Sequence, residues 1–290
     1  MDRNCTLLLG MFDGVHMGHR VLISTAKELG RPVVAYTFDN HPLVVVKGMN
    51  PPMLMTSEEK RDKLLELGVH TVAIETFDAR LARMNEQVYI EMLCARFMPS
   101  AIVVGFNHTF GAGGRGGAET IQALSAAKDY SAIIVPPVTI DEMPVSSTRI
   151  RERIASGDIV SATELLGEPY AFEGIVIRNK GIGTRIGFPT ANIPVPDKIM
   201  PPNGVYAVRA RLDGIAFPGV MNIGVKPTVT ETGVLTIETH LIGFDGDAYG
   251  KKLRLELLSY IRKEHRFQSE KALARQIQLD LDIAHRVYSS

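Results

Sequence analysis

His16 and His19 lie in a glycine-flanked segment between a strand-like run and a helix-like run. From residue 10 the segment reads Gly-Met-Phe-Asp-Gly-Val-His-Met-Gly-His. A strand-to-helix turn offers unpaired backbone N–H groups and the positive end of a helix dipole to an anion. Spaced three apart, both histidines share one face of the first helical turn and can donate to one phosphate, although either could be an ordinary surface or core residue. The candidate phosphate-site residues are Gly10, Phe12, Asp13, Gly14, His16, Gly18 and His19.

A second polar segment, residues 146–149, is expected at a later helix start. It contains Ser146, Ser147, Thr148 and Arg149. Hydroxyls, backbone N–H groups and a guanidinium suit the β- and γ-phosphates of a nucleotide. Taken alone, the segment could equally be a helix N-cap formed by one of the serines.

Residues 111–116 match the pattern G-x-G-x-x-G. A dinucleotide fingerprint follows its strand immediately, whereas residues 106–110 separate these glycines from the strand expected at 101–105. We therefore expect a glycine-rich loop over a ligand and no dinucleotide site.

The second half has no G-x-x-x-x-G-K-[ST] phosphate loop, but it contains a G-F-P-T-A-N segment that we expect in a loop. Its threonine hydroxyl and asparagine oxygen are hard ligands that suit Mg²⁺. Downstream, a strand glutamate facing the mouth of a barrel could accept a hydroxyl proton, or be an ordinary exposed strand residue. The candidates are Gly187, Pro189, Thr190, Ala191 and Asn192 for a nucleotide, Thr190 and Asn192 for the metal, and Glu238 as base.

Alternating strand-like and helix-like runs must position the histidine segment. The expected strands cover residues 6–10, 32–38, 71–74, 101–105 and 132–135, and the expected helices cover 18–29, 56–68, 86–97 and 118–128. Such alternation predicts a parallel sheet with helices on both faces, with ligands at the carboxyl ends of the strands. This α/β domain is predicted to occupy residues 1–168.

The pattern changes near Gly167. The runs beyond it alternate in polarity and are separated by turn residues; they cover residues 172–178, 205–212, 217–222, 235–242 and 253–260. They predict an antiparallel sheet that closes into a small barrel. A final helix, residues 269–287, has one apolar face that would pack on it. The second domain is predicted to occupy residues 169–290.

Composition narrows the classes of partner. In 290 residues, 32 Lys and Arg balance 32 Asp and Glu, so the chain has no basic excess for nucleic acid. Its apolar runs are too short to span a bilayer, and its start shows no signal-peptide pattern. Cys5 and Cys94 match no metal or redox motif. We therefore expect a cytoplasmic protein that binds no nucleic acid and no membrane, with a small anionic partner.

Taken together, these segments resemble the bifunctional bacterial riboflavin kinase/FMN adenylyltransferases, also called prokaryotic FAD synthetases, over nearly the whole chain. The histidine segment has the H-x-G-H signature of nucleotidyltransferases, and residues 146–151 match their S-S-T-x-x-R segment. The other segments that carry the resemblance are residues 37–42, 104–111, 165–167, 187–192, 204–206, 222–224, 227–228, 238 and 249–250.

The resemblance implies a Rossmann-like nucleotidyltransferase domain followed by a six-stranded antiparallel barrel with a terminal helix. It implies two Mg²⁺-dependent reactions: riboflavin and ATP give FMN and ADP, then FMN and ATP give FAD and pyrophosphate. His16 and His19 would be catalytic in adenylyl transfer, with the residues from Ser146 to Arg149 on the triphosphate and Asn107 on the flavin. Thr190 and Asn192 would hold Mg–ATP in the kinase, and Glu238 would activate the ribityl 5′-hydroxyl.

Three positions depart from the family pattern. Asp39-Asn40 replaces the usual Glu-Pro, Asn107 replaces a common Asp, and Asn179 replaces a usual Gly. Asn tolerates left-handed backbone, so we expect Asn179 to change flap geometry or kinetics.

Two alternatives to a bifunctional enzyme are a chain with only one live activity and a flavin- or nucleotide-binding regulator without turnover. The histidine pair and Glu238 favour an enzyme, because binding alone requires neither.

Overall fold

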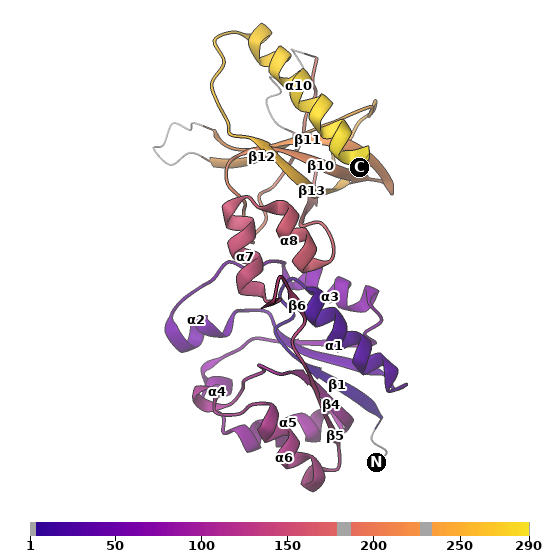
Figure 1. The fold of residues 1–290 in the computed structure, drawn as a ribbon, viewed down its shortest axis with the longest axis vertical. Coiled ribbons are helices and arrows are strands. Elements are labelled where there is room, and N and C mark those ends of the chain that lie inside the picture. The colour runs from indigo at the N-terminus through magenta and orange to yellow at the C-terminus, as the bar shows by residue number, and fades with distance from the viewer. Residues whose placement is uncertain (1–3, 179–186, 227–233, 290) are drawn as a thin grey trace. The chain divides into compact units, whose positions relative to one another are not determined.

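The computed structural model describes residues 4–178, 187–226 and 234–289 (Figure 1). The chain divides into two compact units, Met1–Arg149 and Ile150–Ser290. This division falls inside helix α7 (Ser147–Ser156), upstream of residue 168, where the sequence pattern changes. Asn179, Pro227 and Thr228 lie outside the described residues.

The first unit is built on a parallel sheet with the strand order β3-β2-β1-β4-β5. All five predicted strands are confirmed, with ends within two residues of those expected. They are β1 (Cys5–Leu9), β2 (Val33–Phe38), β3 (Thr71–Glu75), β4 (Pro99–Gly105) and β5 (Ser131–Val135). Because strand order reverses between β1 and β4, the loops that leave their carboxyl ends flank the usual ligand crevice of such a sheet.

Helices cover both faces of this sheet, as expected. Along β1, Leu7 and Leu9 pack into one apolar core and Leu8 into the other, because successive strand side chains point to opposite faces. The four expected helices are α1 (Met17–Glu28), α3 (Ser57–Glu66), α5 (Glu86–Phe97) and α6 (Ala118–Lys128). Buried apolar residues of α1 and α3 join the Leu8 core, and those of α5 and α6 join the other.

Two short helices, α2 (Pro42–Lys47) and α4 (Ala79–Ala82), were not predicted. The run Leu-Val-Val-Val in α2 has no helical periodicity. The helix forms because Pro42 occupies its first turn, the His41 ring accepts a hydrogen bond from the Leu43 N–H, and Gly48 ends it with φ of 64°.

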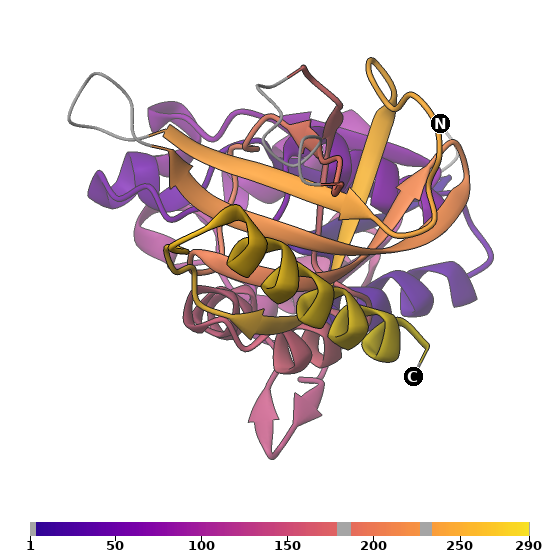
Figure 2. The ribbon, with the colours of Figure 1, turned by 90° about the horizontal axis from the view of Figure 1, so that it is seen from above.

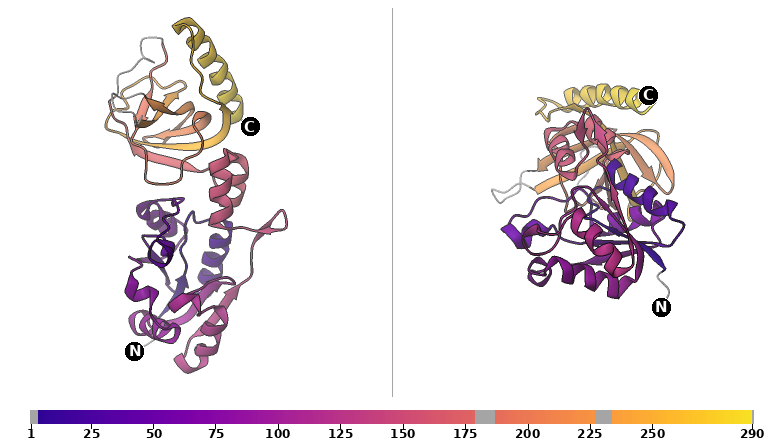
Figure 3. Two further views of the ribbon diagram at one scale, coloured as in Figure 1. Left: turned by 90° about the vertical axis from the view of Figure 1, so that its left-hand side faces the viewer. Right: turned by 60° about the horizontal axis from the view of Figure 1, so that its bottom comes forward.

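A small hairpin ends the first unit. Its strands are β6 (Thr139–Ile140) and β7 (Met143–Pro144). Asp141 and Glu142 form its turn with φ of 53° and 61°, a backbone typical of tight hairpin turns. The hairpin stands out from the unit (Figure 3, left).

The second unit contains a six-stranded antiparallel sheet with the order β8-β13-β10-β11-β12-β9. The edge segments approach each other where the Ile177 N–H donates to the Asn192 carbonyl at 2.8 Å, so the sheet forms a nearly closed barrel (Figure 2). The predicted barrel is confirmed. Its strands are β8 (Ala171–Ile175), β9 (Ala191–Ile193), β10 (Gly204–Leu212), β11 (Ile215–Lys226), β12 (Val234–Leu241) and β13 (Lys252–Arg262).

The prediction was wrong at residues 191 and 192, which were expected in a loop and instead begin β9. Three residues give too short a polarity pattern to read as a strand, and pairing with β12 is what makes them one. Besides α7, helix α8 (Ile159–Leu166) precedes the barrel and contacts β13.

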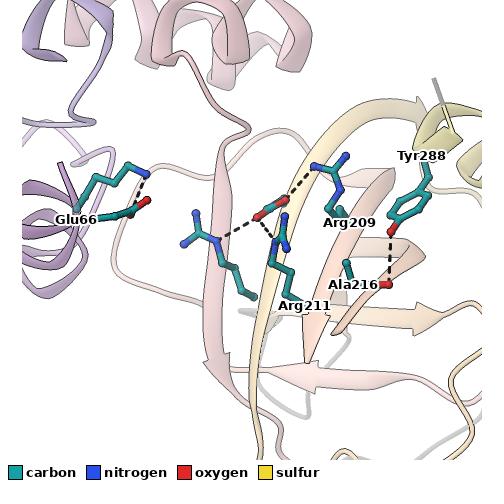
Figure 4. Close-up of polar contacts among 8 residues, drawn as sticks. Glu66, Arg209, Arg211, Ala216 and Tyr288 are labelled. Carbon is teal, nitrogen blue, oxygen red and sulfur yellow. Dashed lines mark hydrogen bonds and ion pairs between the residues drawn. The ribbon is translucent and has the colours of Figure 1, made fainter. Parts of the chain in front are cut away.

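The outer side of the barrel carries an arginine cluster centred on Glu256 of β13. Its carboxylate pairs with Arg209 at 3.3 Å, Arg211 at 2.8 Å and Arg254 at 3.5 Å (Figure 4). Burial alone would raise the pKa of Glu256. Hydrogen bonds from Arg211 and Arg209, with the charges of Arg211 and Arg254, outweigh burial and leave this pKa below its ordinary value.

The expected terminal helix, α10 (Glu270–Ser289), is held to the barrel by a buried ion pair. The Arg262 guanidinium donates Nε and Nη2 to the Asp280 carboxylate at 3.0 and 2.8 Å, and Gln276 donates to the same carboxylate. Asp280 is 1% exposed. Near the C-terminal end of α10, the Tyr288 hydroxyl donates to the Ala216 carbonyl at 3.5 Å (Figure 4).

Replacing Asp280 with Ala should lower the free energy of unfolding of the barrel unit by about 3–5 kcal/mol, because the change leaves a largely buried guanidinium without its partner. Asp282→Ala, on an exposed part of α10, is the matched control and should change stability by no more than about 0.5 kcal/mol. Urea unfolding of both variants measures the difference. Equal stability would show that this ion pair does not hold α10 in place.

Candidate active sites

The segment between β1 and α1 has a strained backbone. Phe12 and Val15 have φ of 48° and 40°, and Gly14 has φ of 83°. A positive φ is unusual for any side chain with a Cβ and is costly for a β-branched one such as valine. Both side chains are fully buried, so packing against the Leu8 core maintains this conformation. Such strain is typical of a functional loop whose shape is fixed by its surroundings.

This loop brings the two histidine rings together at the start of α1. His16 is the N-cap residue, and its ring stacks on that of His19 with centroids 3.7 Å apart and an angle of 18°. Phe12 meets His19 edge-on at 5.2 Å. A Cβ at Gly18 would lie 3.3 Å from the His16 ring, so glycine at this position leaves room for the ring. Among the described residues, the Nδ1 atom of His19 has no hydrogen-bond partner.

The environment keeps His19 uncharged. Burial lowers its pKa, and the positive charges of His16 and Lys60 lower it further, to well below the ordinary value. At neutral pH the ring is therefore a neutral imidazole with one N–H donor and one acceptor nitrogen.

Phe12 and Asp13 support the loop with their side chains. Phe12 is fully buried and Asp13 is 1% exposed. The Asp13 carboxylate accepts the Leu54 N–H at 2.9 Å, and its backbone carbonyl accepts the Ser147 hydroxyl at 2.8 Å. Groups buried in this way can offer a nucleotide their backbone and little else. The structure thus brings Ser147 to the histidine loop across 134 residues of sequence.

The other residues of the serine segment have different surroundings. Ser146 Oγ accepts the Arg149 N–H at 3.3 Å, which is the N-cap contact, and Thr148 is exposed. Arg149 donates to the carbonyls of Ile140 and Met143 at 2.8 and 3.1 Å and pairs with Asp141 at 3.3 Å. Its guanidinium therefore holds the two strands and the turn of the β6–β7 hairpin.

Asn107 follows β4 and is exposed near the carboxyl edge of the sheet, where β1 and β4 are neighbours. The glycine-rich loop that comes next is closed by paired backbone hydrogen bonds of 3.0 Å between Phe110 and Gly116. Gly111 packs on the Glu86 backbone with φ of 73°. This closed loop differs from the strand-to-helix turn of a dinucleotide site.

In the second unit, strand register places three polar residues in one row. Glu238 of β12 lies opposite Asn192 of β9 on one side and Asn222 of β11 on the other. Directly opposed residues share a face of the sheet. That face is opposite the one carrying the buried Ile237 and Thr239, so Glu238 points outward from the barrel wall, where it is half-buried, and not into the mouth of the barrel as expected.

The segment before β9 is held against β12. The His240 ring forms a hydrogen bond through Nδ1 with the Pro189 carbonyl at 2.7 Å and meets Phe188 edge-on at 5.7 Å. Asn192 Nδ2 donates to the Thr190 carbonyl at 3.5 Å, which directs the amide oxygen away from that carbonyl. The hydroxyl of Thr190 and the amide oxygen of Asn192 are oxygen donors of the kind Mg²⁺ prefers.

Sequence reasoning missed Glu264, which the fold brings to this row. Asn222 Nδ2 donates to Glu264 Oε1 at 2.9 Å, and a Cβ at Gly224 would overlap the same carboxylate. Glu264 lies in the charged run Arg-Lys-Glu-His-Arg, which reads as solvent-exposed surface. The only local signal was Gly224, a strand glycine, which can mark close approach of another group.

Asn40 also has a structural explanation. Its side chain exchanges two hydrogen bonds with the Phe77 backbone, at 2.9 and 2.7 Å. It thereby links the segments that follow β2 and β3.

A parallel sheet with stacked histidines at its first strand-to-helix turn, joined to a six-stranded antiparallel barrel, defines a two-part nucleotide-dependent transferase. A family model described as FAD synthetase matches residues 1–149, and one described as riboflavin kinase matches residues 166–288. The chain belongs to the bifunctional riboflavin kinase/FMN adenylyltransferase family.

Sequence similarity to named relatives extends over nearly the whole chain. The bifunctional riboflavin kinase/FMN adenylyltransferase of Bacillus subtilis (strain 168) is 35% identical, covering 98% of this chain and 92% of its own. That of Escherichia coli (strain K12) is 37% identical, covering 96% and 91%. A crystal structure of a macrolide-efflux protein from Streptococcus pneumoniae has a TM-score of 0.90 at 28% identity, covering 98% and 95%. Within the described part of this chain, no helix has the length and apolar character needed to cross a membrane.

Proposed function

We propose that the two reactions of this family are divided between the two parts of the chain: the first adenylylates FMN, and the second phosphorylates riboflavin. The small-molecule partners are then riboflavin, FMN, FAD, ATP, ADP and pyrophosphate. The balance of 32 basic and 32 acidic side chains supports small anionic ligands and no nucleic-acid partner. The reduced thiols of Cys5 and Cys94 and the use of ATP support a location in the cytoplasm, away from membranes.

The observation that carries the first assignment is the stacked histidine pair at the N-terminus of α1. In adenylyl transfer, a phosphate oxygen of FMN attacks the α-phosphorus of ATP. The bond from that phosphorus to the bridging oxygen breaks, and pyrophosphate leaves with both bonding electrons. Imidazole N–H donors and the first N–H groups of a helix stabilise the negative charge that develops there. Ser146, Ser147, Thr148 and Arg149 are the proposed partners of the departing phosphates, and Asn107 that of the flavin.

For Arg149 this role requires a rearrangement, because its guanidinium now holds the carbonyls of the β6–β7 hairpin. Thr148, exposed at the same helix start, needs no such change.

The row centred on Glu238 carries the second assignment. Its carboxylate takes the proton of the ribityl 5′-hydroxyl while that oxygen attacks the γ-phosphorus of ATP, and ADP leaves. Thr190 and Asn192 would hold Mg²⁺, with Gly187, Pro189 and Ala191 shaping the ATP segment. When bound, Mg²⁺ would neutralise charge on the phosphates. His240 fixes this segment through the Pro189 carbonyl.

Product chromatography after incubation with riboflavin, ATP and Mg²⁺ tests this function. FAD supports both assignments. FMN as the only product would mean that only the kinase is active. FAD formed only when FMN is supplied would mean that only the adenylyltransferase is active. Unchanged substrates would favour a binding protein without turnover.

A fragment of residues 150–290 should fold alone and form FMN but no FAD, because it has its own core. A fragment of residues 169–290 should catalyse the same reaction with lower stability. It lacks α8, whose buried face carries Ile159, Ala162, Leu165 and Leu166. Thermal unfolding and product analysis of both fragments measure this. FAD formation by either fragment would contradict the division of labour.

A further inference from the structure

Lys60 of α3 is a buried cation to which the two reactions assign no task. It is 1% exposed. Its Nζ donates to the Phe38 carbonyl at 2.5 Å, the Met11 carbonyl at 3.2 Å and the Thr37 hydroxyl at 3.3 Å. An ammonium has three N–H donors, so these acceptors satisfy all of them. Because an unpaired buried ammonium is costly, the fold has provided a specific place for this charge.

The acceptors lie where the histidine loop begins. Met11 is the second residue after β1, and its carbonyl also accepts the Thr37 hydroxyl at 2.9 Å. Thr37 and Phe38 end β2. Lys60 and Thr37 therefore converge on one carbonyl and fix the Met11–Phe12 peptide, near the start of the loop that carries His16 and His19.

The charge of Lys60 also acts on His19. Burial lowers the pKa of Lys60 to about 8, while the Asp13 and Asp39 carboxylates act to raise it. Lys60 in turn lowers the pKa of His19, after burial and His16. The charged or titratable groups that face Lys60 are thus Asp13 of the loop, Asp39 after β2, and His19 of α1.

A second buried lysine, Lys198 of the barrel unit, provides a contrast. It is 8% exposed and donates to the Ala171 carbonyl at 2.6 Å. Its Nζ lies over the rings of Tyr170 and Phe172 at 5.1 and 5.6 Å, as expected of a structural brace. Burial alone therefore assigns no role to a lysine. Lys60 differs in holding the loop of the phosphate site and in acting on its histidine.

We propose that Lys60 is a positioning residue for adenylyl transfer: it fixes the Met11 end of the histidine loop and places a positive charge close enough to act on the His19 ring. A charge in low-dielectric surroundings acts strongly on a nearby polyanion such as the ATP triphosphate. The inference rests on the assignment of adenylyl transfer to the first unit.

Lys60→Met keeps the length of the side chain and removes its charge and donors. In the full chain, kcat/KM for FAD formation from FMN and ATP should fall about 10²-fold, since a small misplacement of reacting groups costs that order. Riboflavin phosphorylation by the same protein should be unchanged. Arg61→Met is the matched control, because it removes a cation from an exposed position of the same helix and should leave both reactions unchanged.

The pH profile separates this role from that of a structural brace. For the unaltered chain, kcat/KM for FAD formation should decline as pH rises through about 8, because the ammonium of the free enzyme loses its proton. Lys60→Arg keeps its charge beyond pH 12. It should recover part of the activity lost in Lys60→Met and show no decline near pH 8. If Lys60→Met does not fold, this comparison decides alone.

Undiminished FAD formation in a folded Lys60→Met chain would overturn the inference. So would an identical alkaline decline in the unaltered chain and Lys60→Arg. An unaltered chain that makes no FAD at any pH would instead overturn the proposed function on which the inference rests.

Discussion

His19→Ala should lower the rate of FAD formation from FMN and ATP roughly 10²–10³-fold, the usual cost of losing one donor to a developing negative charge. The ring stands at the N-terminus of α1, stacked on His16 and backed by Phe12, so its position is fixed before substrate arrives. Riboflavin phosphorylation should be unaffected, because that reaction is assigned to the barrel. Steady-state rates with FMN and with riboflavin, measured on one protein preparation, give the comparison.

His19→Asn is the informative companion variant, since its amide group still offers N–H donors. It should retain more FAD formation than His19→Ala. Equal losses in both variants would mean that ring stacking, and not hydrogen bonding, is what His19 contributes. FAD formation at the unaltered rate in His19→Ala would remove the residue from the mechanism.

Glu238→Gln should lower riboflavin phosphorylation roughly 10²–10⁴-fold, because a primary alcohol that keeps its proton is a poor nucleophile and a positioned base contributes that much. Glutamine keeps the size of the side chain and its place between Asn192 and Asn222. Riboflavin binding should therefore be largely retained, and FAD formation from supplied FMN should be near normal. Flavin fluorescence titration and the two rate assays measure these three quantities.

Asp245→Asn is the matched control for this prediction. It removes a carboxylate from an exposed position after β12 and should leave phosphorylation unchanged. Equal loss of both reactions in Glu238→Gln would indicate a folding defect, and an unchanged phosphorylation rate would exclude Glu238 as the base.

The same measurements distinguish a bifunctional enzyme from a chain with one active site and from a regulator without turnover. A chain with one vestigial site would respond to only one of the two substitutions, and a regulator without turnover would respond to neither. The structure favours two working sites, because each unit has a fixed arrangement of polar groups: the stacked imidazoles in one and the registered row of Asn192, Glu238 and Asn222 in the other.

The sequence by itself determined the features that depend on neighbouring residues. The period of apolar side chains predicted both sheets, because strand and helix periods differ and each element must bury one face. The H-x-G-H spacing placed both histidines on one helical turn for the same local reason. The sequence also places Gly18 between the two histidines, and the structure adds that the His16 ring lies against it.

Only the tertiary structure decided contacts between distant residues, because these depend on strand order and register, which a local pattern does not specify. Lys60 reaches the Met11 carbonyl across 49 residues of sequence, and Glu264 reaches Asn222 across 42. Arg149 braces a hairpin that no pattern predicted, and residues 191–193 are a strand only because β12 pairs with them. The sequence therefore shows which residue types are present, but their contact partners depend on how the sheets bring remote segments together.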